Sequence, residues 1–419
     1  MFDIKFIREN VELIKKAIEE KGETVDMQRF VKLDNLRREL IQERDAIRRE
    51  KKELSAQIAN LKRTGRGEVT SPLQDSKALS KKEDEIQGKL QTIETELQNI
   101  LIWIPNLAHL SVPRGKEKVV VREWGKKRKF NFQPLTCYDL CNSLGILDFK
   151  RGGKLAGSNF PCYKGIGAQL ERALINFMLD LHLRQGYTEI FPPFLVNRKS
   201  MFGTAQLPKL EQDMYVIEQD DLFLNPTAEV PLVNLHQNET LREEELPIKY
   251  VGYAASFRRE AGSYGKETKG LKRLHQFNKV ELIKFTKPED SYSELESMVQ
   301  DAEEVLKLLN LPYRVTLLPV GDLSFASAKT YDIEVWTPAG SEWLEVSSCS
   351  NCEAFQAKRA GIRFRHEGHT EFVHILNGSG VATPRTFIAI IENYQKPDGT
   401  IQIPDALIPY MERLEKISK

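Results

Sequence analysis

A seven-residue hydrophobic repeat in the first quarter of the sequence constrains the fold more than any other feature. Between about Met27 and Trp103, apolar residues recur every seven positions on either side of a break at residues 64–72, which contains glycine and proline. The first part has the row Leu33, Leu40, Ile47, Leu54 and Leu61, and the second part has the rows Leu79, Ile86, Ile93, Ile100 and Leu90, Leu97, Ile104. Each row lies on one face of a helix. The pattern therefore predicts two helices of about 35 and 30 residues that fold back on each other as an antiparallel coiled coil.

The first of these two helices is basic. Residues 32–66 contain eleven lysines and arginines against six acidic residues, which gives a net charge of +5. One interpretation is a solvated helix surface with ordinary ion pairs. The other is a surface that follows the phosphates of an extended RNA. Charge alone does not decide between them.

Length and composition narrow the class of protein. The 419 residues are enough for two or three domains at about 150 residues each. The formal net charge of +1 excludes a globally basic nucleic-acid binder. Uncharged apolar runs are far shorter than the roughly 18–20 residues of a membrane span, and we expect neither a membrane segment nor a signal peptide. Five cysteines in a chain of this length indicate a reducing, cytoplasmic environment.

The sequence changes character near residue 105. We expect an N-terminal helical domain over residues 1–104, a linker over residues 105–134 with a basic stretch at 115–129, and a globular domain over residues 135–419. In the globular part, apolar strand-like runs follow one another at hairpin distances, with helices between groups of them and a glycine-rich loop at 151–157. This pattern predicts an α+β fold with a mostly antiparallel sheet flanked by helices. The glycine motifs of a Rossmann domain and of a P-loop are both missing from the sequence.

One cluster in the second half of the chain suits a nucleotide. Arg258-Arg259-Glu260 ends a predicted strand, glycines follow at 262, 265 and 270, and Phe277 begins the next strand. Side chains alternate along a strand, so Arg258 and Glu260 share a face. An arginine can grip a phosphate through two hydrogen bonds, a carboxylate can accept from an amine, and Phe277 could stack on a purine. A salt-bridged hairpin is the alternative interpretation.

Three more groups of residues follow along the chain. Glu281 lies four residues beyond Phe277 and either faces solvent or binds an ammonium group. Glu345-Val346-Ser347-Ser348 offers hard oxygen ligands for Mg²⁺, but both end residues can hold one ion only if the strand ends or bulges between them. In Asn377-Gly378-Ser379-Gly380, two glycines let the backbone approach a ligand closely. Arg385 then opens an apolar helix and can supply charge from a rigid element.

Taken in this order, the clusters resemble the three signature motifs of class II aminoacyl-tRNA synthetases. Residues 186–193, which end at Pro193, resemble the dimer-forming first motif, residues 257–277 the second, and residues 377–385 the third. Pro384 stands where the third motif usually has glycine. Thr227-Ala228-Glu229, the Glu345-Val346-Ser347-Ser348 motif and the helical arm narrow the resemblance to the bacterial-type seryl-tRNA synthetases.

This resemblance implies an activity and partners. The expected enzyme activates L-serine with ATP to seryl-adenylate and transfers the seryl group to the 3′ end of serine tRNA; the charging of selenocysteine tRNA is left open. The serine carboxylate is already a nucleophile, so charge stabilisation and alignment take the place of a general base. The resemblance also implies a cytoplasmic homodimer whose coiled-coil arm grasps the long variable arm of the tRNA.

The resemblance assigns a role to each matching residue. Arg258 would hold the α-phosphate, Glu260 would contact the adenine, and Phe277 and Arg385 would enclose that ring. The residues implied for ATP are Arg258, Arg259, Glu260, Phe277, Glu345, Val346, Ser347, Ser348 and Arg385. Of these, Glu345 and Ser348 would hold Mg²⁺, and Arg258, Arg385 and Glu345 are the expected catalytic residues. The expected serine pocket consists of Thr227, Ala228, Glu229, Glu281 and Ser379.

Other interpretations are weaker. A non-catalytic RNA-binding protein of the same fold would be expected to lack at least one of four residues that are all present: Arg258, Glu260, Glu345 and Arg385. An enzyme that loads a carrier protein has no use for an arm of this length. Zinc is not expected, because nothing in the spacing of the pairs Cys137/Cys141 and Cys349/Cys352 brings them together.

Overall fold

The structure, a computed structural model, describes residues 1–65, 69–261 and 270–419. Its contacts divide the chain into two compact units, Met1–Pro105 and Asn106–Lys419, and each unit is described by itself. The expected glycines at 262 and 265 and residues 66–68 of the predicted break lie outside the described residues. None of the described helices is long and apolar enough to cross a membrane.

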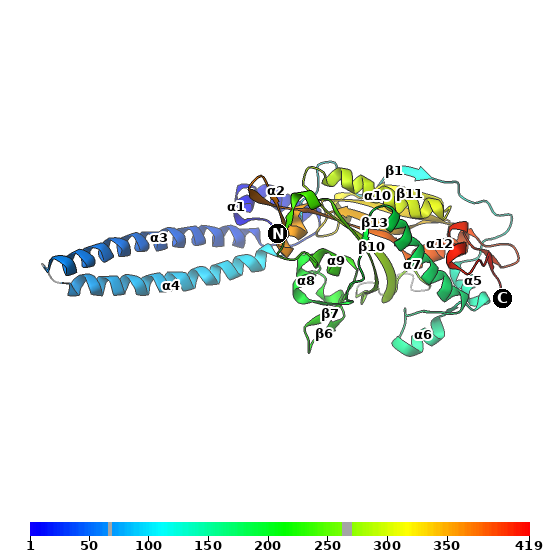
Figure 1. Cartoon of the computed structure of the whole chain (residues 1–419), viewed down its shortest axis with the longest axis horizontal. Coiled ribbons are helices and arrows are strands. Elements are labelled where there is room, and N and C mark those ends of the chain that lie inside the picture. Colours follow the sequence, from blue (N-terminus) through cyan, green and yellow to red (C-terminus); the bar gives the residue numbers. More distant parts are fainter. Residues whose placement is uncertain (66–68, 262–269) are drawn as a thin grey trace. The chain divides into compact units, whose positions relative to one another are not determined.

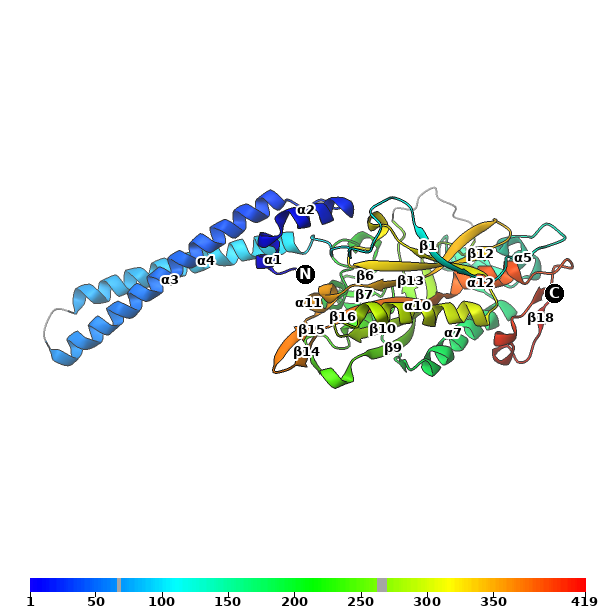
Figure 2. The ribbon, with the colours of Figure 1, turned by 90° about the horizontal axis from the view of Figure 1, so that it is seen from above.

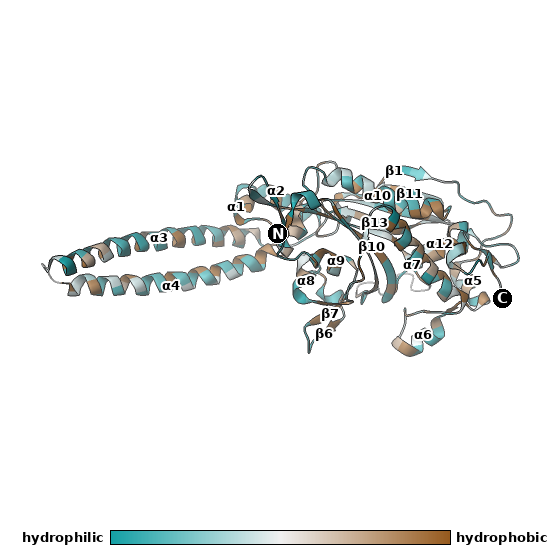
Figure 3. Cartoon of the chain, in the orientation of Figure 1, coloured by the Kyte–Doolittle hydropathy of each residue, from teal (hydrophilic) through white to brown (hydrophobic). Residues whose placement is uncertain are grey.

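The first unit consists of helices. They are α1 (Ile4–Glu9), α2 (Val11–Glu20), α3 (Met27–Thr64) and α4 (Thr70–Leu101). Two views show α3 and α4 running side by side as a hairpin, which confirms the two predicted helices (Figures 1 and 2). The seven-residue rows supply the buried side chains between them, among them Leu40, Ile47, Leu90 and Leu97. Hydrophilic residues predominate along α3 (Figure 3).

The second unit is built on an eight-stranded sheet with the order β1-β11-β12-β13-β16-β10-β9-β4. Every neighbouring pair is antiparallel except β4 and β9, so the predicted α+β class with a mostly antiparallel sheet is confirmed. In sheet order the strands are β1 (Val119–Trp124), β11 (Tyr313–Leu317), β12 (Lys329–Thr337), β13 (Glu342–Asn351), β16 (His374–Ala382), β10 (Gln276–Thr286), β9 (Ile248–Phe257) and β4 (Thr188–Glu189).

Helices and short strands surround this sheet. The helices are α5 (Cys137–Leu144), α6 (Phe149–Ala156), α7 (Ile166–Arg184), α8 (Arg198–Gly203), α9 (Glu229–Asn234), α10 (Ser291–Leu308), α11 (Ala354–Ala360) and α12 (Thr383–Asn393), with 3₁₀ turns η1 (Glu211–Asp213), η2 (Glu243–Glu245), η3 (Val320–Asp322) and η4 (Asp405–Tyr410). The short strands are β2 (Leu147–Asp148), β3 (Cys162–Tyr163), β5 (Leu195–Asn197), β6 (Val216–Ile217), β7 (Leu222–Leu224), β8 (Thr240–Arg242), β14 (Arg363–His366), β15 (His369–Phe372), β17 (Ile401–Gln402) and β18 (Lys416–Ile417).

Different helices pack against the two faces of the main sheet. On β10, Val280 and Leu282 belong to the large core that includes residues of α7, α10 and α12. The alternate residues Ile283 and Phe285 pack into a second core with residues of α9 and α11. The same strand face carries Glu281, because side chains on a strand alternate with period two. The second core leaves this part of the face open as a cavity.

Two expectations about the chain between residues 105 and 157 are wrong. Residues 106–134 are part of the second unit and contribute β1, which pairs with β11 at the edge of the main sheet. The three valines at 119–121 form this strand within a strongly charged stretch. The expected glycine-rich loop is helix α6, which Asp148 caps by accepting a hydrogen bond from the backbone N–H of Arg151.

Candidate active site

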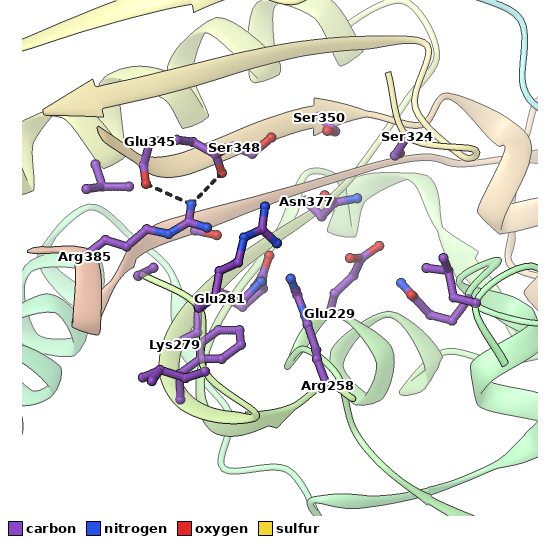
Figure 4. A pocket seen from close by; sticks show the side chains of 18 of the residues that line it. Glu229, Arg258, Lys279, Glu281, Ser324, Glu345, Ser348, Ser350, Asn377 and Arg385 are labelled. Atoms are coloured by element: carbon purple, nitrogen blue, oxygen red, sulfur yellow. Dashed lines mark hydrogen bonds and ion pairs between the residues drawn. The ribbon is translucent and has the colours of Figure 1, made fainter. Parts of the chain in front are cut away.

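Three neighbouring strands of the main sheet and the chain after β9 supply the charged residues of one cavity. Phe277, Lys279 and Glu281 come from β10, Asn377 and Ser379 from β16, and Glu345 and Ser348 from β13. Arg258 and Glu260 follow the end of β9, and Arg385 lies in the first turn of α12. In Figure 4, Arg385 lies beside Glu345 at one end of this pocket, and Glu229 lies towards the other.

Most of the expected site residues line this cavity. They are Glu229, Arg258, Glu260, Phe277, Glu281, Glu345, Val346, Ser348, Ser379 and Arg385. Thr227 lines an adjoining cavity that shares Glu229 and Arg258 with the first. Three expected residues line neither cavity: Ala228 is fully buried, Arg259 makes a backbone hydrogen bond to Asp213, and Ser347 donates to the carbonyl of Ser379.

Two carboxylates, the buried Glu281 and the half-buried Glu229, mark one end of the cavity. Glu281 is 2% exposed, accepts a hydrogen bond of 3.0 Å from the Thr227 hydroxyl and forms an ion pair with Lys279. Glu229 accepts 2.7 Å from the amide of Gln356, which is itself fully buried. Burial and the nearby charge of Glu281 raise the pKa of Glu229 to about 7, against the opposing effects of Gln356, Lys279 and Arg258. The two carboxylates suit an ammonium group.

The middle of the cavity is cationic. Arg258 donates from Nε to the carbonyl of Pro226 at 3.3 Å, and its guanidinium lies 5.2 Å from the centroid of the Phe277 ring. Burial lowers the pKa of Arg258 from its usual value, but an arginine remains charged after such a shift. Glu260 forms an ion pair of 3.0 Å with Arg273. Arg258 is therefore a fixed positive charge that faces a solvent-accessible cavity, which is the arrangement that binds a phosphate.

A β-bulge brings two of the predicted metal ligands to the same side. Ile333 pairs with Ser347 and Glu334 with Glu345, so Val346 is an extra residue in β13. For Glu345 and Ser348 to share one ion, their spacing in the sequence required the strand to end or to bulge between them, and a bulge is present. Asp332 lies opposite Ser348, and burial and the charge of Glu345 raise the pKa of its carboxyl to about 6. These oxygen donors fit a hard divalent cation.

Arg385 closes this end of the cavity. Its Nη1 donates to the carbonyl of Glu345 at 2.9 Å and lies 3.2 Å from the Glu345 carboxylate. Pro384 lies in the first turn of α12, where the missing N–H breaks no helical hydrogen bond. The replacement of the usual glycine by Pro384 therefore leaves Arg385 directed at the cavity.

The glycines of the Asn377-Gly378-Ser379-Gly380 segment have a different purpose from the one expected. A Cβ at Gly378 would lie 2.8 Å from the sulfurs of Cys349 and Met298, and one at Gly380 would lie 2.5 Å from the His182 ring. Both contacts are on the helix-covered face of the sheet. These glycines therefore let α7 and α10 pack closely under β16, while Asn377 and Ser379 face the cavity.

The sequence did not reveal Lys279, Gln356 and Asp332 as site residues. Lys279 sits between Phe277 and Glu281 with the same period-two spacing, a signal that could have been used. Gln356 is 127 residues from Glu229 and Asp332 pairs with the bulged strand, so both depend on long-range packing.

Among the described residues, no group of three or more histidine, cysteine or acidic side chains could hold a metal ion.

The fold and this cavity define a class II aminoacyl-tRNA synthetase. A model of the class II tRNA synthetase core domain (G, H, P, S and T) matches residues 211–394, and a model of the seryl-tRNA synthetase N-terminal domain matches residues 1–108. The chain belongs to the seryl-tRNA synthetase family.

Full-length relatives support this assignment. The serine–tRNA ligase of Thermodesulfovibrio yellowstonii is 52% identical over 418 residues, which cover 98% of this chain and 99% of the relative. That of Geobacillus sp. is 53% identical over 424 residues and 100% of both chains. The crystal structure of the Pyrococcus horikoshii seryl-tRNA synthetase complexed with ATP is 36% identical, with a TM-score of 0.94 over 100% of this chain and 99% of that one. The Naegleria fowleri enzyme in complex with AMP is 30% identical, with a TM-score of 0.89 over 100% of this chain and 99% of that one.

Proposed function

We propose that the cavity between β10, β13 and β16 activates L-serine with ATP and then passes the seryl group to the 3′ end of serine tRNA. In the first step the serine carboxylate oxygen attacks the α-phosphorus of ATP, an O–P bond forms, and pyrophosphate leaves. In the second step a ribose hydroxyl of the terminal adenosine attacks the seryl carbonyl, and AMP leaves. The observation that carries the proposal is that the carboxylates of the buried Glu281 and the half-buried Glu229 share one cavity with a fixed arginine, in a chain from this family.

In this proposal, serine binds at the carboxylate end. Glu229 and Glu281 accept the ammonium group, and the Thr227 hydroxyl keeps the Glu281 carboxylate in place. Gln356 is a positioning residue, because its amide holds Glu229 and also donates to the carbonyl of Thr204 at 3.2 Å. Ser379 supports selection of the serine hydroxyl. A site that pairs a hydroxyl rejects alanine, because the polar groups left unpaired are costly. Threonine is excluded by size.

ATP binds across the remainder of the cavity. Arg258 holds the α-phosphate, where charge develops in the transition state. Glu260 takes the adenine amine, and Phe277 and Arg385 lie on the two faces of the ring. Glu345 and Ser348 hold Mg²⁺, which would supply positive charge to the phosphates when bound. In this proposal, Arg259 and Ser347 contribute to the ATP site, and Ala228 to the serine site, through backbone atoms and not through their side chains.

The direct test is ATP–pyrophosphate exchange without tRNA, measured across amino acids. All the described residues that line the cavity lie in the second unit, so exchange is expected with serine and without RNA. Strong exchange with threonine or proline and none with serine would overturn the proposal.

The pH dependence of serine binding is a second test. The pKa of Glu229 is about 7, so the carboxyl group is largely neutral below that pH and attracts an ammonium group poorly. The ammonium and carboxylate groups of serine stay charged near neutral pH. We expect the KM for serine in the exchange assay to rise as pH falls from about 8 to about 6, by up to about tenfold per unit below the pKa. The Glu229→Gln variant should have a high KM that does not change with pH. A flat profile in the unsubstituted protein would show that Glu229 does not bind the ammonium.

We also propose a homodimer formed through α7, β4 and the segment that ends at Pro193. Phe191 supports this, because its large aromatic side chain is 76% exposed beside the sheet edge. Sedimentation at micromolar concentration is expected to give twice the chain mass of 48.1 kDa, and Phe191→Asp should shift the protein towards the monomer. A mass of one chain for the unsubstituted protein would contradict the interface.

Two further assignments belong to this proposal. The partner is serine tRNA, whose long variable arm is bound by the α3–α4 hairpin. The location is the cytoplasm, which the five free cysteines support because thiols persist in reducing compartments.

A further inference from the structure

A run of four cations follows the edge strand β1. Lys126, Lys127, Arg128 and Lys129, called the basic segment below, carry four positive charges in four residues of a chain whose net charge is only +1. Lys126, Lys127 and Lys129 are exposed, and Arg128 is half-buried. Like charges repel at this spacing, so the cluster raises the energy of the free protein unless an anion binds to it.

Lys118, which directly precedes β1, and Arg122, which lies on β1, differ from the basic segment in their partners. Lys118 lies 2.8 Å from Asp332, and Arg122 lies 2.6 Å from Glu303, so both are neutralised within the unit. Among the described residues, no acidic side chain forms an ion pair with any residue of the basic segment. Charges that guard a sheet edge against aggregation would lie on the strand itself. The basic segment begins after the strand has ended, so edge protection does not account for it.

Aromatic rings hold two of the four side chains of the basic segment in place. The Lys127 ammonium lies 3.7 Å from the centroid of the Trp336 ring and 4.9 Å from that of Trp343. The Arg128 guanidinium lies 3.8 Å from the centroid of the Tyr394 ring. Cation–π contacts of this kind leave the positive charge exposed while they restrict the side chain. A cation that is already ordered gives up less conformational entropy when it binds a phosphate.

The same tryptophans connect the basic segment to the rim of the active site. Trp336 and Trp343 face each other across β12 and β13, and Trp343 precedes Glu345 by two residues on the same strand face. Two residues along a strand span only about 7 Å. Next to Trp343, Glu342 forms an ion pair of 2.6 Å with Lys272, which lines the cavity. The basic segment, the β12–β13 hairpin and the cavity therefore form one continuous surface within the second unit.

We propose that the basic segment binds backbone phosphates of the tRNA acceptor end and guides that end into the active site. The inference rests on the proposed function, because a tRNA that accepts serine must bring its 3′ end into the cavity. In this proposal, the phosphates next to that end pass the part of the rim that lies beside the β12–β13 hairpin. Ordered, unneutralised cations on that rim match a polyanion in charge, and they contact phosphates without reading bases.

The test is the triple charge reversal Lys126→Glu, Lys127→Glu and Lys129→Glu, which leaves Arg128 packed on Tyr394. Serine-dependent ATP–pyrophosphate exchange is expected to stay within about twofold, because none of the three residues lines the cavity. The KM for tRNA in the charging assay should rise at least about tenfold. In a plot of the logarithm of tRNA affinity against the logarithm of salt concentration, the slope should become shallower by about one for each phosphate that the variant no longer binds. The matched control reverses three exposed cations elsewhere in the unit, Lys199, Lys358 and Arg365, and should change the KM for tRNA much less.

Each other outcome has a definite meaning. An unchanged KM for tRNA and salt slope, with exchange intact, overturns the inference and leaves the proposed function standing. If the control variant raises the KM for tRNA equally, the inference is also overturned, because the overall charge of the unit would then explain the result. The triple alanine variant guards against misfolding: if it loses exchange together with charging, the segment supports the fold and the inference is wrong. No serine-dependent exchange by the unsubstituted protein would remove the proposed function itself.

Discussion

Replacing Arg258 with alanine is expected to lower kcat/KM for serine-dependent ATP–pyrophosphate exchange by 100-fold or more, about 3 kcal/mol of transition-state stabilisation. The reason is that Arg258 is the half-buried cation fixed between Pro226 and Phe277 in the centre of the cavity. Negative charge grows on the α-phosphate as the serine oxygen attacks, and a preorganised guanidinium stabilises that charge without reorganisation. Steady-state exchange over a range of ATP and serine concentrations measures the loss.

Two companion variants locate the effect. Arg258→Lys keeps the charge but lacks the planar pair of donors, so it should recover only part of the activity. Arg259→Ala removes the neighbouring arginine side chain, which does not line the cavity, and keeps the backbone N–H that donates to Asp213. We expect a change of less than about fivefold for this second variant. Exchange by Arg258→Ala within about threefold of the unsubstituted protein would place the α-phosphate elsewhere.

Features that depend on local periodicity could be predicted from the sequence. The rows through Leu40 and Leu90 set the helical hairpin, because a seven-residue period determines which face of each helix is buried. The spacing of Glu345 and Ser348 showed that they could share one ion only if the strand ended or bulged between them, and the bulge at Val346 meets that condition. The α+β class followed from the succession of strand-like runs. In each case the information lies within one segment or within a motif of fixed spacing.

Features that depend on distant partners could not be predicted. Strand β1 is an edge strand in a charged stretch, and only its pairing with β11 stabilises it. Residues 151–157 resemble a loop because of their glycines, but the Asp148 cap starts a helix and Gly152 lets Phe160 approach closely. The hydrogen bond between Gln356 and Glu229 joins two helices far apart in the chain. Tertiary contacts outweighed local preference at each of these places.

Shortening the helical hairpin is expected to separate the two steps of the reaction. Removal of residues 41–93, with a short glycine linker, should leave seryl-adenylate formation within about twofold and lower kcat/KM for tRNA charging at least about 100-fold. The cut keeps the base of the first unit, where Arg8 donates to Asp34 at 2.9 Å and Leu33 and Leu97 are buried. Exchange should persist because no residue that the structure describes in the first unit lines the cavity. Exchange and charging assays on the same preparation measure the two effects.

The loss should come from charge on α3, because its 38 residues extend about 57 Å and carry an exposed basic face. Glu83 neutralises Arg48 and Lys51. Three other cations of α3 are exposed: Arg49, Lys52 and Arg63. They lie on one face of the helix, because residues three or eleven positions apart point to the same side.

Reversing Arg49, Lys52 and Arg63 to glutamate should therefore reproduce most of the loss and flatten the salt dependence of binding. Reversing Lys77, Lys81 and Lys89 on α4 is the comparison, and its effect should be smaller. If the shortened protein charged tRNA with unchanged kcat/KM, the basic face of α3 would be an ordinary solvated surface, and tRNA selection would have to reside in the second unit.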